Sequence, residues 1–193
     1  MATPSIWKYL PVNKITAAKI TSSLKLHPVI ARLLVSRGIS GDDEARLFLW
    51  PTLDQLHDPL LMTDIDVTVD RILKAVQSNE RIAVHGDYDV DGVTATVILY
   101  RILSLLGANV IHYIPDRLSD GYGLRPEGID RLKMTGSTLI ITVDCGIKST
   151  VAAERARTLG VDLIITDHHQ PGTTLPPALA VINPRRPDCG YPD

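Results

Sequence analysis

A run of carboxylates directly after a short apolar segment constrains this chain more than any other feature of its sequence. Residues 82–84 (IAV) predict a short buried strand. His85 follows at once, and then come Asp87, Asp89 and Asp91. Carboxylates this close repel one another, and a bound divalent cation is the usual compensation. The spacing predicts either a metal site at the end of a strand or a solvated acidic loop in front of a helix.

Beyond this segment the chain alternates between helix and strand patterns. Further strands are predicted at 109–114, 137–143, 161–166 and 179–182, and helices at 92–106, 126–134 and 149–159. Strands and helices that alternate in this order form a parallel sheet with helical crossovers. We therefore expect an α/β fold, a Rossmann-like, doubly wound parallel sheet.

The first 62 residues have a different pattern. They predict three short helices, at 13–24, 28–38 and 44–49, and they contain no cluster of chemically reactive side chains. An amphipathic helix at 64–78 then leads into the first strand. We expect a small helical N-terminal lead-in over 1–62 and the α/β domain over 63–193.

Acidic and imidazole side chains follow two further predicted strands. Asp144 comes directly after 137–143, and 167–169 (DHH) come directly after 161–166. Because the carboxyl ends of parallel strands meet along one edge of a sheet, these groups should converge with those that follow 82–84. Carboxylates and imidazoles, with no requirement for thiolate, favour Mn²⁺ or Mg²⁺ over structural zinc.

Other chemistries for this edge have weaker support in the sequence. A zinc site built from Cys145, Cys189, His168 and His169 matches no known zinc spacing. Cys145 is also a candidate nucleophile, although a packing role beside Asp144 suits a residue after a strand end. A dinucleotide site is disfavoured because the first turn reads DYDVDG and not G-x-G-x-x-G.

Composition limits the partners and the compartment. The net charge of −2 gives no basic footprint for nucleic acid, but it leaves room for a nucleic-acid substrate held by a metal and a few placed groups. Two cysteines without a disulfide pattern favour a reduced, cytoplasmic setting. The sequence contains no apolar run of membrane-spanning length and no signal peptide, so we expect no membrane association.

Three segments carry a family resemblance. GDYDVDGVTAT, TVDCGI and TDHHQPG resemble the motifs of the DHH phosphoesterase superfamily. FLWPTLDQLHDP, IPDRLSDGYGL and LPPALAVINPRRPDCGYP, together with the helical lead-in, are similar to its single-strand-specific exonuclease branch. The resemblance runs from about residue 30 to the last residue.

The resemblance implies a phosphodiesterase of DNA repair and recombination that uses two Mn²⁺ or Mg²⁺ ions and removes nucleotides from the 5′ end of single-stranded DNA. It implies metal ligands at His85, Asp87, Asp89, Asp91, Asp144 and His168. It implies catalytic roles for Asp89, Asp144, His168 and His169. Asp167 would orient the histidines, and His169, Arg117 and Tyr122 would contact the substrate.

Members of this family continue past the region matched here. They carry a further metal-binding aspartate and then a second, glycine-rich domain that grips the substrate. The chain is therefore expected to be an N-terminal part with an incomplete metal site, whose partners are single-stranded DNA and the missing C-terminal domain. Two alternatives stay open: a DHH enzyme acting on pyrophosphate, oligonucleotides or cyclic dinucleotides, and a non-catalytic metal-binding module.

Overall fold

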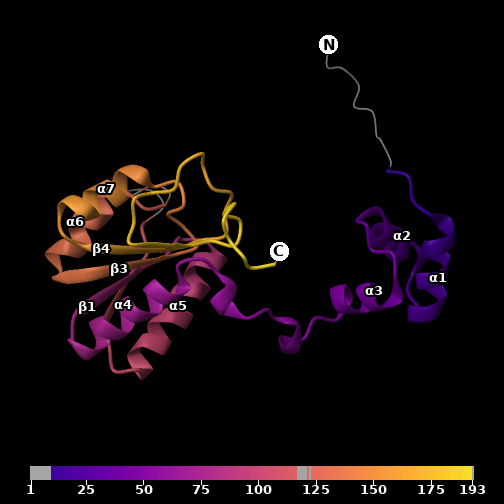
Figure 1. The fold of residues 1–193 in the computed structure, drawn as a ribbon, viewed down its shortest axis with the longest axis horizontal. Coiled ribbons are helices and arrows are strands. Elements are labelled where there is room, and N and C mark those ends of the chain that lie inside the picture. Colours follow the sequence, from indigo (N-terminus) through magenta and orange to yellow (C-terminus); the bar gives the residue numbers. More distant parts are fainter. Residues whose placement is uncertain (1–9, 117–120, 122, 193) are drawn as a thin grey trace, which may run out of the picture. The chain divides into compact units, whose positions relative to one another are not determined.

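The structure, a computed structural model, describes residues 10–116, 121 and 123–192. It divides into two compact units, residues 1–56 and residues 57–193, each of which is described by itself (Figure 1). The domain boundary that the sequence suggests between residues 62 and 63 stays a prediction.

The N-terminal unit is a small helical cluster. Its helices are α1 (Lys14–Leu24), α2 (Pro28–Ser36) and α3 (Asp42–Leu49), followed by the short 3₁₀ turn η1 (Leu53–Gln55). Asn13 begins α1, because its Oδ1 accepts hydrogen bonds from the backbone N–H groups of the first turn. The buried core consists of Ala17, Ile20, Ala31, Leu34 and Ala45.

The second unit is built on a five-stranded sheet in which every neighbouring pair is parallel. Its strands are β1 (Arg81–His85), β2 (Asn109–Tyr113), β3 (Ser137–Val143), β4 (Asp162–Thr166) and β5 (Ala180–Ile182), in the order β2-β1-β3-β4-β5. This arrangement confirms the parallel α/β fold expected from the alternating pattern. The central strands β1, β3 and β4 are buried on both faces, which explains their nearly continuous apolar sequences.

Helices cover both faces of this sheet. In Figure 1, α6 (Pro126–Met134) and α7 (Thr150–Thr158) lie on one side, and α4 (Ile65–Gln77) and α5 (Val90–Leu105) lie on the other. Side chains that alternate along each strand enter two separate cores. One core contains Ala83, Ile140, Leu163 and Ile165 with α6 and α7, and the other contains Ile82, Val84, Leu139, Ile141 and Ile164 with α4.

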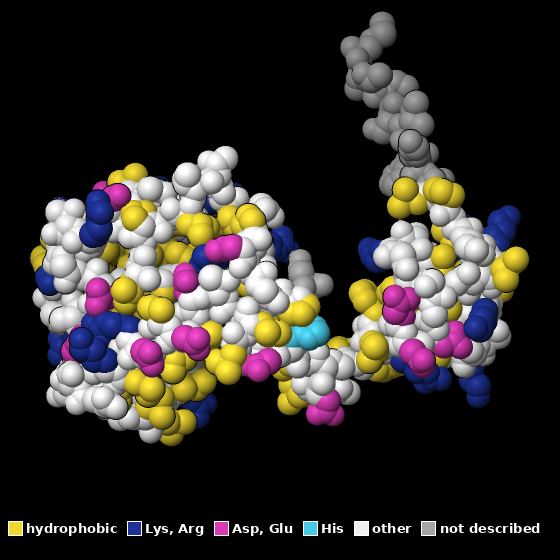
Figure 2. Space-filling view, in the orientation of Figure 1, with side chains coloured by type: hydrophobic (Ala, Val, Ile, Leu, Met, Phe, Trp, Pro, Cys, Tyr) yellow, Lys and Arg dark blue, Asp and Glu magenta, His cyan; other side chains and the backbone are white. Residues whose placement is uncertain are grey.

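Helix α5 exposes apolar side chains on the side turned away from the sheet. Val97, Ile98, Ile102 and Leu105 are at least half exposed, and Figure 2 shows apolar side chains gathered over this helix. α5 is therefore apolar around most of its circumference. No helix in the described part of the chain combines the length and the apolar character needed to cross a membrane.

Candidate metal centre

The topology creates a crevice beside β1. β1 pairs with β2 on one side and with β3 on the other, so the strand order reverses between β1 and β3. In open α/β sheets, ligands bind at such a switch point, outside the carboxyl ends of the strands. His85 ends β1 opposite Thr142 of β3, which places the acidic loop after β1 next to Asp144.

The loop after β1 turns tightly into α5. Asp89 is the N-cap of α5, and its Oδ1 accepts a hydrogen bond from the Gly92 N–H at 3.0 Å. The helix consequently begins at Val90, two residues before the start predicted from the apolar pattern. A Cβ at Gly92 would lie 2.5 Å from backbone atoms of Asp87, and one at Gly86 would lie 2.8 Å from the Gly92 carbonyl oxygen. Only glycine allows this close approach of loop and helix.

His85 and Asp87 point into the protein. Both side chains are buried, and His85 Nδ1 lies 3.7 Å from Cys145 Sγ. One oxygen of Asp87 accepts the Tyr88 N–H at 2.7 Å, whereas Oδ2 has no hydrogen-bond partner among the described residues. A buried carboxylate oxygen without a partner is costly, and a cation is one group that satisfies it.

Asp144 occupies the centre of the crevice. Its φ of 61° lies in the left-handed region, which is strained for a non-glycine residue and is found mostly at functional sites. The carboxylate is buried, with Oδ1 lying 2.9 Å from His168 Nε2. Asp144 Oδ2 has no hydrogen-bond partner within the described part of the chain. The backbone conformation therefore holds an uncompensated oxygen at the switch point.

Asp167 organises the loop that follows β4. Its Oδ1 accepts the backbone N–H groups of His168 and His169 at 2.8 and 3.0 Å, and its Oδ2 accepts the Ile147 N–H at 2.9 Å. His169 Nδ1 also lies 2.7 Å from Asp167 Oδ1. This contact fixes a proton on Nδ1 and leaves Nε2 as the basic nitrogen of the ring.

These loops bring three of the sequence-predicted residues into one cluster. Asp144, His168 and His169 each offer a ligand atom, and the three atoms lie within 4.8 Å of one another. Asp89 lies near enough to Asp144 for each carboxyl group to affect the pKa of the other. Residues from the ends of β1, β3 and β4 thus meet at one point.

The electrostatics of the cluster reflect repulsion between like charges. Burial, and then the neighbouring Asp89, raises the pKa of the Asp144 carboxyl. The Gly92 N–H lowers the pKa of Asp89. The hydrogen bond to Asp167 raises the pKa of His169, against the opposing effect of burial. Two carboxyls and two imidazoles this close fit a hard divalent cation, which would remove the repulsion and satisfy Asp144 Oδ2.

The remaining predicted residues are placed differently. Asp91 lies in the first turn of α5 and lines a hollow of about 500 Å³ together with Asp144 and His168. His85 and Asp87 lie under the loop and do not belong to the three-residue cluster. Arg117 and Tyr122 lie outside the described residues.

Asn183 is a residue of this edge that sequence reasoning missed. It follows β5 directly and is buried, and its Nδ2 donates to the His169 carbonyl oxygen at 2.9 Å. Its Oδ1 accepts the Arg185 N–H at 2.8 Å. The signal was available, because Asn183 is a polar residue directly after a predicted strand, like Asp144 and Asp167.

Among the described residues, the group that could hold a metal includes no cysteine, and Cys145 is poorly suited to the nucleophile that the sequence left open. Cys145 is buried, and burial raises the pKa of its thiol well above the ordinary value. A thiol of raised pKa is a poor nucleophile and a poor metal ligand. It lies under the loop beside His85, where it packs as a small side chain.

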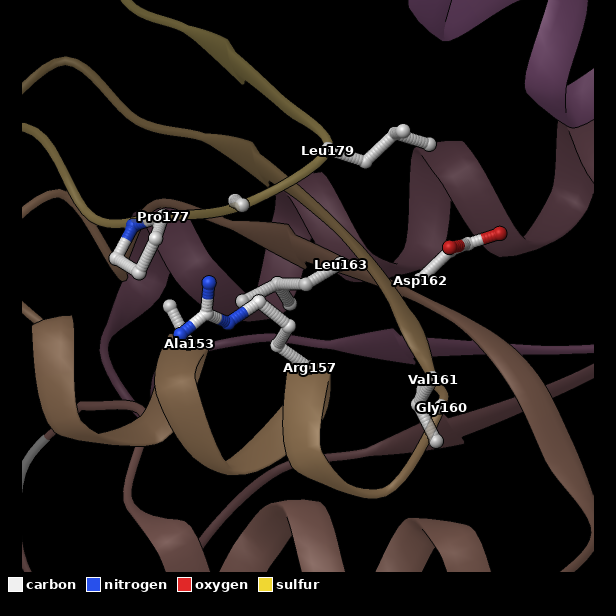
Figure 3. A pocket seen from close by; sticks show the side chains of 9 residues that line it. Ala153, Arg157, Gly160, Val161, Asp162, Leu163, Pro177 and Leu179 are labelled. Carbon is white, nitrogen blue, oxygen red and sulfur yellow. The ribbon is translucent and has the colours of Figure 1, made fainter.

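A hollow at the opposite edge of the sheet is separate from this centre. It has a volume of about 260 Å³ and is lined by Arg157 of α7, by Asp162 at the start of β4 and by Leu179 before β5 (Figure 3). None of the predicted site residues that the structure describes lines it. It lies at the amino end of β4, where parallel sheets do not usually bind ligands.

Comparisons with known proteins agree with this geometry. The sequence model described as "DHH family, N-terminal domain" matches residues 81–191. Single-stranded-DNA-specific exonuclease RecJ of Bacillus subtilis (strain 168) is 40% identical over 192 residues, which cover 100% of this chain and 24% of that protein. The protein of the same name from Escherichia coli (strain K12) is 40% identical over 169 residues, or 87% of this chain and 29% of that protein.

Solved structures give the same picture. The crystal structure of RecJ in complex with Mn²⁺ from Thermus thermophilus has a TM-score of 0.66 and 34% identity, covering 91% of this chain and 24% of that one. A crystal structure of exonuclease RecJ bound to manganese has a TM-score of 0.61 and 42% identity, covering 66% of this chain and 33% of that one. The chain thus spans about a quarter of the length of the curated relatives it matches.

Proposed function

The chain belongs to the DHH family, and from this membership we propose that it forms the N-terminal part of a metal-dependent phosphodiesterase that hydrolyses single-stranded DNA from its 5′ end. The observation that carries the proposal is the cluster of Asp144, His168 and His169, with Asp89 against it, at the switch point of the sheet. The named activity of the RecJ relatives, which are 40% identical, supports the choice of substrate.

The proposed cofactor is Mn²⁺ or Mg²⁺, with two ions in the complete site. Asp89, Asp144, His168 and His169 would hold it, and the predicted ligands His85, Asp87 and Asp91 lie around them. Such a cation, when bound, stabilises negative charge on a phosphate and lowers the pKa of water. The described RecJ structures, whose names include manganese, support this choice.

The chain's own side chains prepare the site. Asp167 holds the His169 ring and both backbone N–H groups of the histidine pair, so that the imidazoles keep a fixed direction. Asn183 restrains the same loop from the other side through the His169 carbonyl. The strained backbone of Asp144 keeps its carboxylate between the ends of β1 and β4. Catalysis would depend on this preorganisation, because the phosphate must be met by groups already in place.

The substrate, the residues that contact it and the cellular compartment are also proposed. Single-stranded DNA is the proposed substrate, Arg117 and Tyr122 are proposed substrate contacts, and the rest of a longer protein would close the cleft. The protein is proposed to act in DNA repair and recombination in the cytoplasm. The part of the proposal that a longer protein closes the cleft is supported by the length of the Bacillus subtilis relative, which is about four times that of the matched region.

A chimera tests this function. Residues 1–193 would replace the matching N-terminal residues of the Bacillus subtilis relative, and hydrolysis of 3′-labelled single-stranded DNA would be followed with Mn²⁺. We expect stepwise release of nucleotides from the 5′ end, and loss of that release in the same chimera carrying Asp144→Asn. Preference for duplex DNA, inorganic pyrophosphate or a cyclic dinucleotide would contradict the proposal.

A further inference from the structure

Three hollows lie in a row at the carboxyl edge of the sheet, each sharing one lining residue with the next, and this row is called the groove below. The metal hollow, about 500 Å³, is lined by Asp91, Asp144 and His168. It shares Asp167 with a middle hollow of about 300 Å³, which also includes Lys148 and His169. The metal hollow and the middle hollow are therefore neighbours on either side of Asp167.

The middle hollow is in turn next to a basic hollow. The two share Gly123, and the basic hollow has a volume of about 230 Å³. Its lining residues include two arginines, Arg125 and Arg131, and one acidic residue, Glu127. The charges of these side chains therefore sum to one positive charge, in a chain whose net charge is −2.

Arg131 is held in place by an aromatic ring. Its guanidinium lies 5.3 Å from the centre of the Tyr113 ring, and its Nη1 donates to the Tyr113 hydroxyl at 2.7 Å. A guanidinium that is fixed by stacking loses little entropy when it binds an anion. Gly128, which also lines this hollow, lies close to His85, since a Cβ at Gly128 would lie 3.6 Å from His85 Nε2.

We propose that the basic hollow binds a second phosphate of the same nucleic-acid strand, different from the phosphate that is cleaved. Arg125 and Arg131 are the proposed binding residues. This inference rests on the proposed function, which places the cleaved phosphate at the metal cluster. A strand that enters the groove carries its neighbouring phosphates along the same edge, and the guanidinium groups are suited to bind phosphate oxygens in pairs. The phosphate is either the terminal 5′-phosphate or an internal phosphodiester.

Binding without metal tests the proposal without requiring turnover. The chain would be titrated, in EDTA and low salt, into two 3′-fluorescein oligothymidylates that carry either a 5′-phosphate or a 5′-hydroxyl, with anisotropy as the readout. The variants are Arg125→Gln, Arg131→Gln and the charge-preserving Arg131→Lys. Arg157→Gln is the matched control, because Arg157 lies at the opposite edge of the sheet. Thermal unfolding would verify that each variant is folded.

We expect Arg125→Gln and Arg131→Gln each to weaken binding by about 5- to 20-fold, from the loss of a charge-assisted hydrogen bond. Arg131→Lys should recover part of the affinity, and Arg157→Gln should change it by less than about twofold. Losses confined to the 5′-phosphorylated strand would assign the hollow to the terminal phosphate, and equal losses on both strands to an internal phosphodiester.

Unchanged affinity in both glutamine variants would overturn the proposal, and so would a wild-type chain that binds neither strand. Failure of the proposed function gives a different result. In that case the metal-free binding and its arginine dependence persist, while the Mn²⁺-dependent release of nucleotides by the chimera is absent.

Discussion

Asp144 combines three properties that are rarely found in one carboxylate. It is buried, its backbone lies in the left-handed region, and one of its oxygens has no hydrogen-bond partner among the described residues. Burial, and then Asp89, raises the pKa of its carboxyl group, and a bound cation would oppose this effect by favouring the charged form. Strained and uncompensated groups of this kind are found mostly at functional sites, where a ligand compensates for their energetic cost.

Replacing this carboxylate tests its role in metal binding. Asp144→Asn should weaken Mn²⁺ binding by at least about 10- to 100-fold, because the loss of a direct ligand exceeds the effect of losing an outer partner. Isothermal titration calorimetry of the chain measures this change. Asp70→Asn, on the exposed side of α4, is the control and should bind Mn²⁺ like the wild type. Equal affinity of Asp144→Asn and wild type would remove Asp144 from the site.

The raised pKa of His169 predicts a pH dependence. Asp167 stabilises the imidazolium, so His169 keeps its proton to higher pH than an ordinary histidine, whose pKa is about 6.5. A metal needs the unprotonated nitrogen. Mn²⁺ affinity should therefore fall as the pH decreases through a range that begins above about 6.5. Constant affinity from about pH 8 to about pH 5 would show that the histidines are not ligands.

Sequence spacing could predict which side chains reach this edge, but not which way each one points. Asp144 and Asp167 follow strands directly and His168 comes one residue later, so the topology alone brings them to the edge. The burial of His85 and Asp87 depends on how the loop after β1 folds over α5, which the residue types do not reveal. Asn183 also follows a strand directly, but its uncharged amide does not mark it as part of a metal site in the sequence.

At the level of elements, the packing of the β1–α5 loop determines the geometry of the site. Gly86 and Gly92 let the loop backbone lie against the first turn of α5, and Asp89 then caps the helix. The apolar pattern predicted α5 but not its first residue, because the cap depends on this loop. The pattern also could not reveal which side of α5 faces the sheet, since both sides are apolar.

A methyl group at Gly92 should disrupt this loop. Gly92→Ala places a Cβ 2.5 Å from the Asp87 backbone, and overpacking of this kind typically costs about 1–3 kcal/mol. Urea unfolding measures the loss, and Mn²⁺ affinity should fall with it as Asp89 moves. The control is Gly172→Ala, whose Cβ would lie 3.6 Å from the nearest atom and should be nearly neutral. A Gly92→Ala chain of wild-type stability would contradict the account.

An ion-pair network links α4 to the amino ends of the strands. Arg71 donates to Glu80 and to Asp162, both at 2.6 Å, and Thr138 also donates to Glu80. This ion-pair network lies at the opposite edge of the sheet from the metal cluster, so a substitution in the network tests stability alone. The hydrogen bond from Arg71, followed by that from Thr138, lowers the pKa of Glu80.

Arg71→Met should lower the free energy of unfolding by about 1–3 kcal/mol at neutral pH, because it leaves partly buried acceptors unpaired. A lowered Glu80 pKa contributes stability above the unfolded value of about 4.3, and that contribution is lost as the pH falls through the folded value. The difference between wild type and variant should therefore shrink on acidification. A difference that grows between about pH 6 and about pH 3 would contradict this assignment.

In the whole molecule, the direction of the strands determines where the candidate metal centre lies. Parallel strands place their carboxyl ends on one edge, and the order β2-β1-β3-β4-β5 places the switch point between β1 and β3. The alternation of strand and helix patterns predicted the parallel sheet. The strand order was not accessible from local patterns, because it depends on packing between segments that are distant in the sequence.

The most direct test of the central claim is anomalous diffraction from crystals of this chain grown with Mn²⁺. The account predicts a manganese peak between Asp89, Asp144, His168 and His169, at about 2.0–2.6 Å from the coordinating atoms. The same peak should disappear in crystals of Asp144→Asn. A saturated crystal without a peak in this crevice, or with manganese bound by other residues, would contradict the claim that these strand ends form a metal centre.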